Sequence, residues 1–180
     1  MADDEAVRAW LRERGAEGIT HPGGTLYDHL SRVHDRLVAH GLAPDLCRAG
    51  LTHAAYGTDG FDVTLLDLDR RETLRALVGP AAEAQVYRYC AGDRKLTWRG
   101  LARTGELHDR FTGTVEQLEP DDLRAFADLS IVNELDLVER DPTIGERFGA
   151  YFREVFGSWA PVASPEVMRD ARSVLAALGQ

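Results

Sequence analysis

Apolar residues recur at helical spacing along most of the chain. In residues 25–41 they fall on one face of a helix with about 3.6 residues per turn, and Gly41 ends the pattern. Similar patterns predict one helix on each side of Gly79-Pro80 and further helices over residues 3–14, 45–56, 121–139, 143–156 and 164–178. The spacing therefore predicts an all-α fold.

Residues 95–115 depart from this helical pattern. Thr97, Trp98 and Val115 are of types that favour β-strands, so a small β-hairpin insertion is predicted in this range. The chain has no internal repeat and no low-complexity segment, and its 180 residues suit one globular domain. We therefore expect a single domain over residues 1–180.

Composition narrows the possible partners. An apolar fraction of 44% is too high for a disordered chain, and no apolar run approaches the roughly 20 residues of a membrane span. The net charge of −9, without a long run of Lys or Arg, argues against nucleic acid and anionic membranes. The acidic start is unlike a secretory signal, and Cys47 and Cys90 lack metal-finger spacing. We expect a cytoplasmic protein that takes a small-molecule substrate or ligand; the oligomeric state is not predicted.

Histidines carry the candidate chemistry, since the chain has no phosphate-binding-loop, His-Glu-x-x-His or Cys-x-x-Cys motif. His53 lies on a small, apolar helix face, where burial of an imidazole costs free energy unless its nitrogens find partners. We therefore interpret His53 as a site residue. His29 and His34 flank the apolar stripe of residues 25–41. For His29 a site role and a place at the core edge are equally favoured, whereas His34 and His40 fit the core edge better.

A third helix supplies a polar surface. Ser130, Asn133 and Glu134 interrupt the apolar stripe of residues 121–139, and buried polar groups need partners. Two structural explanations are a groove open to water and an ion pair between Glu134 and an arginine. The functional explanation is a pocket in which these residues face His29 and His53.

These residues carry a resemblance to a known superfamily. The stretch from His21 to Phe61 has His-x-Gly-Gly-Thr-Leu and His-x-x-Tyr-Gly-Thr elements and resembles a divergent HD-domain protein. It is also similar to an uncharacterised domain family that keeps both elements. In HD domains one helix brings a histidine, a later helix a His-Asp pair and a distant helix an aspartate, and together they hold one or two metal ions. The resemblance implies an HD-like helical bundle in which His29, His53 and Asn133 occupy three of these positions.

Two departures from the HD pattern limit the metal. Ala54 stands where the pair has its aspartate, and Asn133 where the distant aspartate is expected. Without these carboxylates a two-metal centre is not expected. We expect at most one divalent transition ion (Fe, Mn, Zn or Ni) on His29 and His53, serving hydrolysis or an oxidative step, with His21, Glu134 or Asn133 completing the ligand shell.

Two alternatives stay open. Without a metal, His29 and His53 would act directly as acid and base in a lyase, isomerase or cyclase type of reaction, and otherwise the fold would be a non-catalytic small-molecule binding module. Tyr56 would donate a proton or only pack its ring. The sequence also suggests further contacts to a substrate, alongside purely structural roles for each of these residues. They are Arg70, Arg71, His34 and Ser130.

Overall fold

The computed structural model describes residues 3–178 and confirms the all-α prediction. Within that range the chain forms ten α-helices and two small two-stranded sheets. Its residues cluster into two compact units, one up to Ala91 and one from Gly92 onward. Each unit is described by itself, and the single domain expected over residues 1–180 stays a prediction. No helix within residues 3–178 is long and apolar enough to cross a membrane.

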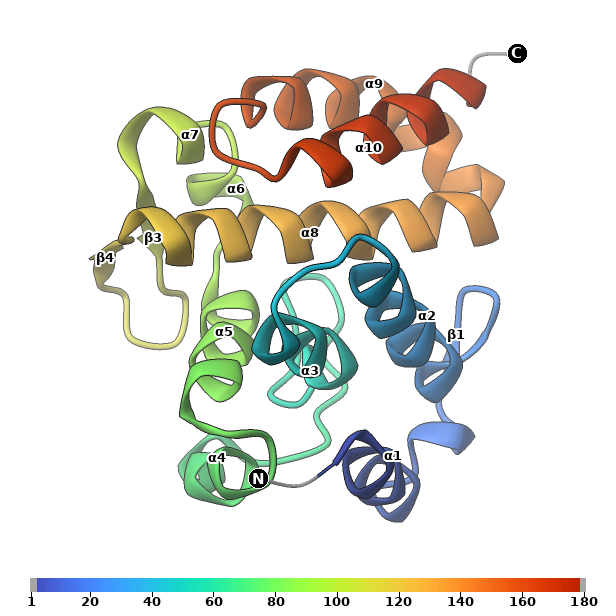
Figure 1. The fold of residues 1–180 in the computed structure, drawn as a ribbon, viewed down its shortest axis with the longest axis vertical. Coiled ribbons are helices and arrows are strands. Elements are labelled where there is room, and N and C mark those ends of the chain that lie inside the picture. The colour runs from blue at the N-terminus through green and yellow to red at the C-terminus, as the bar shows by residue number, and fades with distance from the viewer. Residues whose placement is uncertain (1–2, 179–180) are drawn as a thin grey trace. The chain divides into compact units, whose positions relative to one another are not determined.

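Three helices form the centre of the first unit. The helices α2, α3 and α5 pack in that order, with α3 in contact with both neighbours (Figure 1). The boundaries of the elements in this unit are α1 Asp4–Glu13, a 3₁₀ turn Ala16–Gly18, β1 Thr20–His21, β2 Gly24–Thr25, α2 Leu26–Ala39, α3 Pro44–Thr52, a 3₁₀ turn Leu68–Arg70, α4 Arg71–Val78 and α5 Pro80–Ala91.

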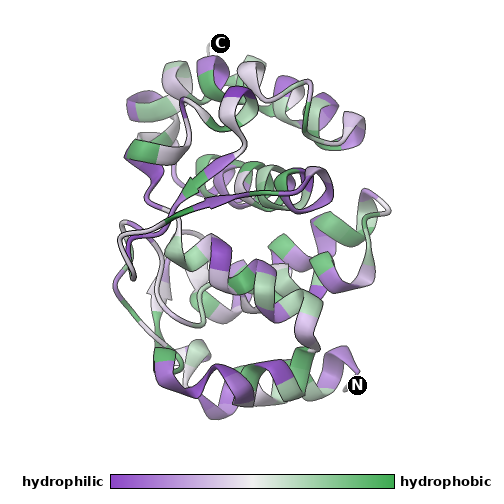
Figure 2. Cartoon of the chain, turned by 90° about the vertical axis from the view of Figure 1, so that its left-hand side faces the viewer, coloured by the Kyte–Doolittle hydropathy of each residue, from purple (hydrophilic) through white to green (hydrophobic). Residues whose placement is uncertain are grey.

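Local sequence explains where the first helices begin. Asp3 accepts a hydrogen bond from the Ala6 N–H at the start of α1. Thr25 and Asp28 form a reciprocal capping box at the start of α2. Residues 22–23 join β1 to β2 in a short antiparallel hairpin. The helices carry both apolar and polar residues, as Figure 2 shows by hydropathy.

One long helix organises the second unit. The helix α8, Pro120–Arg140, packs against both α9, Pro142–Ser158, and α10, Pro165–Ala177 (Figure 1). Asp128 of α8 fixes the start of α10, because its carboxylate accepts hydrogen bonds from the Ser164 N–H at 2.8 Å and the Ser164 hydroxyl at 2.6 Å. The remaining elements are α6 Arg94–Thr97, α7 Leu101–Thr104, β3 Glu106–His108 and β4 Val115–Gln117.

Two sequence-based boundaries need correction. A hairpin does form, from β3 and β4, but Thr97 lies in α6 and Trp98 caps it, so the strand assignment of these two residues was wrong. The helix forms there because the Asp93 side chain accepts the Leu96 N–H at 2.9 Å, which outweighs the local β-propensity. The helix predicted over 45–56 ends at Thr52, and the chain turns at His53.

The close approach of α2 and α3 depends on Gly50. A Cβ atom added to this buried residue would overlap Leu37 Cδ1 and lie 3.4 Å from Val33 Cγ1. Leu37 and Val33 are themselves fully buried, so a shift of either side chain would disturb its packed neighbours. Gly157 of α9 offers the opposite case, because an added Cβ would have no neighbour within 4 Å.

We expect Gly50→Ala to destabilise the protein by about 1–3 kcal/mol, since overpacking outweighs the better helix propensity of alanine. The matched control Gly157→Ala, which adds the same methyl group in open space, should instead stabilise by up to about 1 kcal/mol. Urea unfolding followed by circular dichroism measures both. An equal gain in stability for the two variants would contradict the close α2–α3 packing.

Candidate functional site

Two histidines of the first unit meet in its interior. His29 comes from α2 and His53 follows the last residue of α3. Their Nε2 atoms lie 3.3 Å apart, and the residues are only 1% and 2% exposed. Because α2 and α3 are held together at Gly50, the pair is fixed by the packing of the helices that carry it.

The proton positions on His53 follow from its other nitrogen. His53 Nδ1 lies 2.7 Å from the carbonyl oxygen of Gly50. A carbonyl oxygen only accepts, so Nδ1 carries the proton and Nε2 presents a lone pair toward His29. This is the arrangement in which a backbone carbonyl orients a metal-binding or proton-accepting imidazole.

Aromatic rings surround this pair. The ring of His21, from β1, stacks on that of His29 with 4.2 Å between centroids, and the ring of Phe61 meets His21 edge-on. On the other side the Tyr89 ring meets His53 edge-on at 5.0 Å. The sequence-predicted residues His21, His29 and His53 therefore lie together, and the rings of His21 and Tyr89 pack against the pair.

Helix α5 supports the turn that carries His53. The Cys90 thiol donates to the His53 carbonyl oxygen over 3.0 Å. Glu83, only 2% exposed, accepts from the Tyr56 hydroxyl at 2.9 Å and from Arg71 at 2.7 and 3.0 Å. Sequence motifs do not indicate Glu83 and Cys90 as site residues. They are seven residues apart and lie on one face of α5. An acidic residue on the apolar face of a predicted helix was the signal that could have indicated Glu83.

Tyr56 and Arg71 have structural partners in this network. The Arg71 guanidinium forms two hydrogen bonds to Glu83 and lies over the Tyr87 ring at 3.8 Å. Burial, together with the negative charge of Glu83, raises the pKa of Tyr56 well above its ordinary value. Tyr56 therefore holds its proton toward Glu83, and the predicted catalytic role of Tyr56 and substrate-binding role of Arg71 stay predictions.

The other predicted residues of this unit have various environments. His34 lies between two acids, with Nδ1 2.8 Å from Asp35 and Nε2 3.3 Å from Asp4 of α1. It thus links α1 to α2. His40 caps the end of α2, and Arg70 is exposed. The substrate-binding roles given to His34 and Arg70 stay predictions.

In the second unit, Glu134 is held by hydrogen bonds. Its Oε1 accepts from Arg94 at 2.7 Å and from the Asn133 amide at 2.9 Å, and the Arg94 guanidinium lies over the Trp98 ring. The ion pair weighed in the sequence analysis is therefore present. Ser130 is buried, and its hydroxyl has no hydrogen-bond partner within residues 3–178. The expected convergence of these α8 residues with His29 and His53 stays a prediction.

The described residues offer few ligand atoms for a metal ion. Within the described residues, no group of three or more His, Cys, Asp or Glu side chains is placed to hold one. Two imidazole nitrogens converge, those of His29 and His53, and His21 does not complete a three-donor group with them. Ala54, which follows His53 in the chain, is 2% exposed and brings no ligand atom.

Comparison with known proteins points to the first unit. Residues 10–94, just under half of the chain, match the model of a family described as a domain of unknown function (DUF6817). No curated protein and no solved structure matches the chain. The matched range contains the histidine pair, the rings around it and the Glu83 network.

The hydrogen bond from Tyr56 to Glu83 should be measurable in unfolding experiments. We expect Tyr56→Phe to destabilise the protein by about 1 kcal/mol at pH 7, because Glu83 loses one buried donor. The control Tyr27→Phe removes a hydroxyl that only accepts from exposed Arg12, and should cost less than about 0.5 kcal/mol.

The pH dependence gives a second measurement of the same bond. Since folding raises the pKa of Tyr56, its contribution is present below pH ~10 and is lost as pH rises beyond that value. The wild-type protein should therefore lose stability more steeply than Tyr56→Phe between about pH 10 and 11. Parallel profiles for the two proteins would be inconsistent with a buried Tyr56–Glu83 bond.

Proposed function

We propose that this protein is an enzyme acting on a small molecule, with the His29–His53 pair as its reaction centre. The observation that carries the proposal is the buried contact of 3.3 Å between the two Nε2 atoms. The Gly50 carbonyl supports it, because it orients the lone pair of His53 toward that contact.

The pair fits one transition-metal ion and does not fit two. Two nitrogens, each about 2.0–2.1 Å from a tetrahedral ion, lie roughly 3.3–3.4 Å apart, which matches the His29–His53 distance. Imidazole suits Fe, Mn, Zn or Ni, whereas a second ion would need carboxylates to offset the charge, and Ala54 supplies none. One such ion would serve as a Lewis acid for hydrolysis or as the redox centre of an oxidative step.

The surrounding residues position the pair. Gly50 holds the His53 ring through its carbonyl, and Cys90 and Tyr89 of α5 contact the same residue. His21 covers one face of His29. The Gly50 carbonyl is a fixed dipole on the Nδ1–H of His53, so it would stabilise positive charge that develops on this imidazole, which favours catalysis over binding alone.

A metal-free acid/base enzyme is the second candidate. It is favoured by the lack of a third donor within the described residues and by a distance that also suits a hydrogen bond between the two rings. In this case His29 Nε2 donates to His53 Nε2 at rest, and a substrate would displace His29 from that lone pair before His53 Nε2 accepts its proton. Lyase, isomerase or cyclase chemistry would follow.

Metal content separates these candidates. We expect the untagged protein, expressed with added Fe, Mn, Zn and Ni salts, to contain at most one of these ions per chain by elemental analysis. His29→Gln and His53→Gln should each lower its affinity at least about tenfold, because each removes one nitrogen ligand. The control His40→Gln, at the end of α2, should retain it.

Three results would contradict one or both forms of the proposal. Two ions per chain would show that the ligands have been misassigned. No ion in the wild-type protein would contradict the metal form of the proposal and leave the acid/base enzyme. Turnover in a substrate screen that survives in folded His53→Gln would contradict both forms.

Restoring the missing carboxylate tests the resemblance to HD domains. We expect Ala54→Asp to tighten metal binding about tenfold or more, if residue 54 lies where that superfamily has its metal-binding aspartate. Ala55→Asp is the control, because Ala55 is equally buried beside it but has no counterpart among the HD ligands. Titration of both folded variants with Mn²⁺ or Zn²⁺ gives the comparison. Equal affinities would count against HD-like geometry at this turn.

A further inference from the structure

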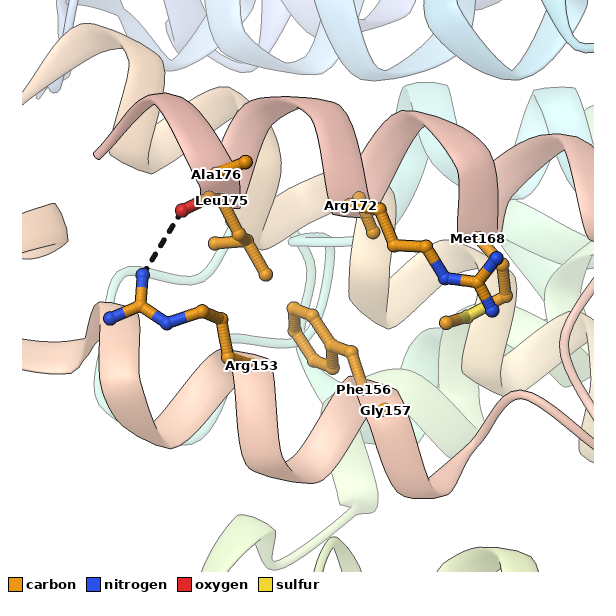
Figure 3. Close-up of a pocket in the computed structure, with 8 residues that line it drawn as sticks. Arg153, Phe156, Gly157, Met168, Arg172, Leu175 and Ala176 are labelled. Atoms are coloured by element: carbon orange, nitrogen blue, oxygen red, sulfur yellow. Dashed lines mark hydrogen bonds between the residues drawn. The ribbon is translucent and has the colours of Figure 1, made fainter. Parts of the chain in front are cut away.

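A groove lies between α9 and α10 in the second unit. Its volume is about 170 Å³, and its floor is apolar, built from Phe156 of α9 and from Met168, Ala171 and Leu175 of α10. Figure 3 shows Phe156 and Leu175 facing each other between the two helices. A cavity of about 150 Å³ with such a lining holds benzene, so this groove has room for about six carbon atoms.

Glycines of α9 explain why the groove opens where it does. Toward one end, Leu178 packs against Gly145 and Gly149, where added Cβ atoms would lie 2.8 and 3.4 Å from its side chain. Further along α9, Gly157 lines the groove, and a Cβ added there would meet nothing within 4 Å. The helices are thus in contact at one end and leave a space beside Gly157.

Positive charge borders this apolar space. Arg153 lies near one end of the groove and donates to the Leu175 carbonyl oxygen over 3.0 Å (Figure 3). Arg172 extends along the other end, beside Met168 (Figure 3). Arg172 makes no hydrogen bond or ion pair with any residue in the described range 3–178, and no acidic residue lines the groove. The Arg172 guanidinium is therefore available to an anion, with no acidic side chain of the groove to compete for it.

We propose that this groove binds a small amphipathic anion, a carboxylate with an apolar tail of about six carbons. The tail would occupy the space between Phe156 and Leu175. The carboxylate would pair with the Arg172 guanidinium, whose planar fork suits two parallel hydrogen bonds to it. This site is separate from the histidine pair, and the proposal does not depend on the proposed function.

Met168 provides a direct probe for this binding. The chain contains two methionines, so labelling with ¹³C-methyl methionine gives few signals, and Met168→Leu identifies the one from the groove. We expect titration with hexanoate to shift the Met168 methyl signal in a saturable way. 1-Hexanol, which has the same tail without the charge, should bind about fivefold more weakly or worse.

Three variants test the residues separately. Arg172→Gln should weaken hexanoate binding about fivefold, because the charge-assisted bonds are lost. Its control is Arg169→Gln on the same helix, where Arg169 pairs with Glu166 and does not line the groove. Gly157→Leu should fill the space without a clash and abolish the shift, while α9 stays folded by circular dichroism.

Three results would overturn the proposal. One is a Met168 signal that hexanoate does not shift in a saturable way. Another is equal binding of hexanoate and 1-hexanol, or equal effects of Arg172→Gln and Arg169→Gln, which would remove the role of the charge. The third is a Met168 shift that follows protein concentration without hexanoate, because a second copy of the chain would then cover the groove.

Discussion

The first unit depends on the satisfaction of two buried imidazoles. A buried polar ring without partners would cost several kcal/mol, so His29 and His53 are tolerated only because their nitrogens are engaged. Helix α3 ends at Thr52, and the carbonyls of its last turn lack the N–H donors that a further turn would supply. His53 Nδ1 donates a hydrogen bond to one of these carbonyls, that of Gly50. One hydrogen bond therefore both caps the end of α3 and orients the His53 ring.

The end of α3 at this point also determines the path of the residues that follow it. After His53 the chain turns back through Ala55, whose N–H donates to the Thr52 carbonyl oxygen, and whose own carbonyl accepts from the N–H groups of Leu65 and Leu66. Tyr56 then reaches Glu83, and Cys90 reaches the His53 carbonyl. Helix α5 thus fixes the turn from the side opposite α2. Displacement of either helix would disturb the contact between the two Nε2 atoms.

The sequence predicts some of these features well and others not at all. Helical spacing and capping residues such as Thr25 and Asp28 are local, so the positions of most helices follow from them. His53 stood out because an imidazole on a face of small apolar residues needs partners. Glu83 and Cys90 did not, because their partners Tyr56 and His53 lie 27 and 37 positions away. Pairing over such distances leaves no mark in a periodic pattern.

Local propensity also failed where a single cap decided the structure. Trp98 is of a β-favouring type, yet Asp93 starts a short helix just before it, and its ring packs on Trp159 in the interior of the second unit. Likewise, the sequence shows the polar positions on α8 but does not indicate which structural or functional explanation applies to them. Arg94, which binds Glu134, is 40 positions away in the chain.

Ala54 connects the chemistry of the pair to the stability of the fold. An aspartate at this buried position would place a negative charge beside the histidines, and a bound cation would then be needed to offset it. With alanine there, one ring can donate to the other while Gly50 binds the remaining proton of His53, so the buried nitrogens facing each other are satisfied by protein groups alone. We therefore expect the first unit to fold without metal, unlike structural zinc domains. A metal ion at His29 and His53 would replace one hydrogen bond and would not be needed to hold the unit together. Such an ion would have a catalytic role and not a structural one.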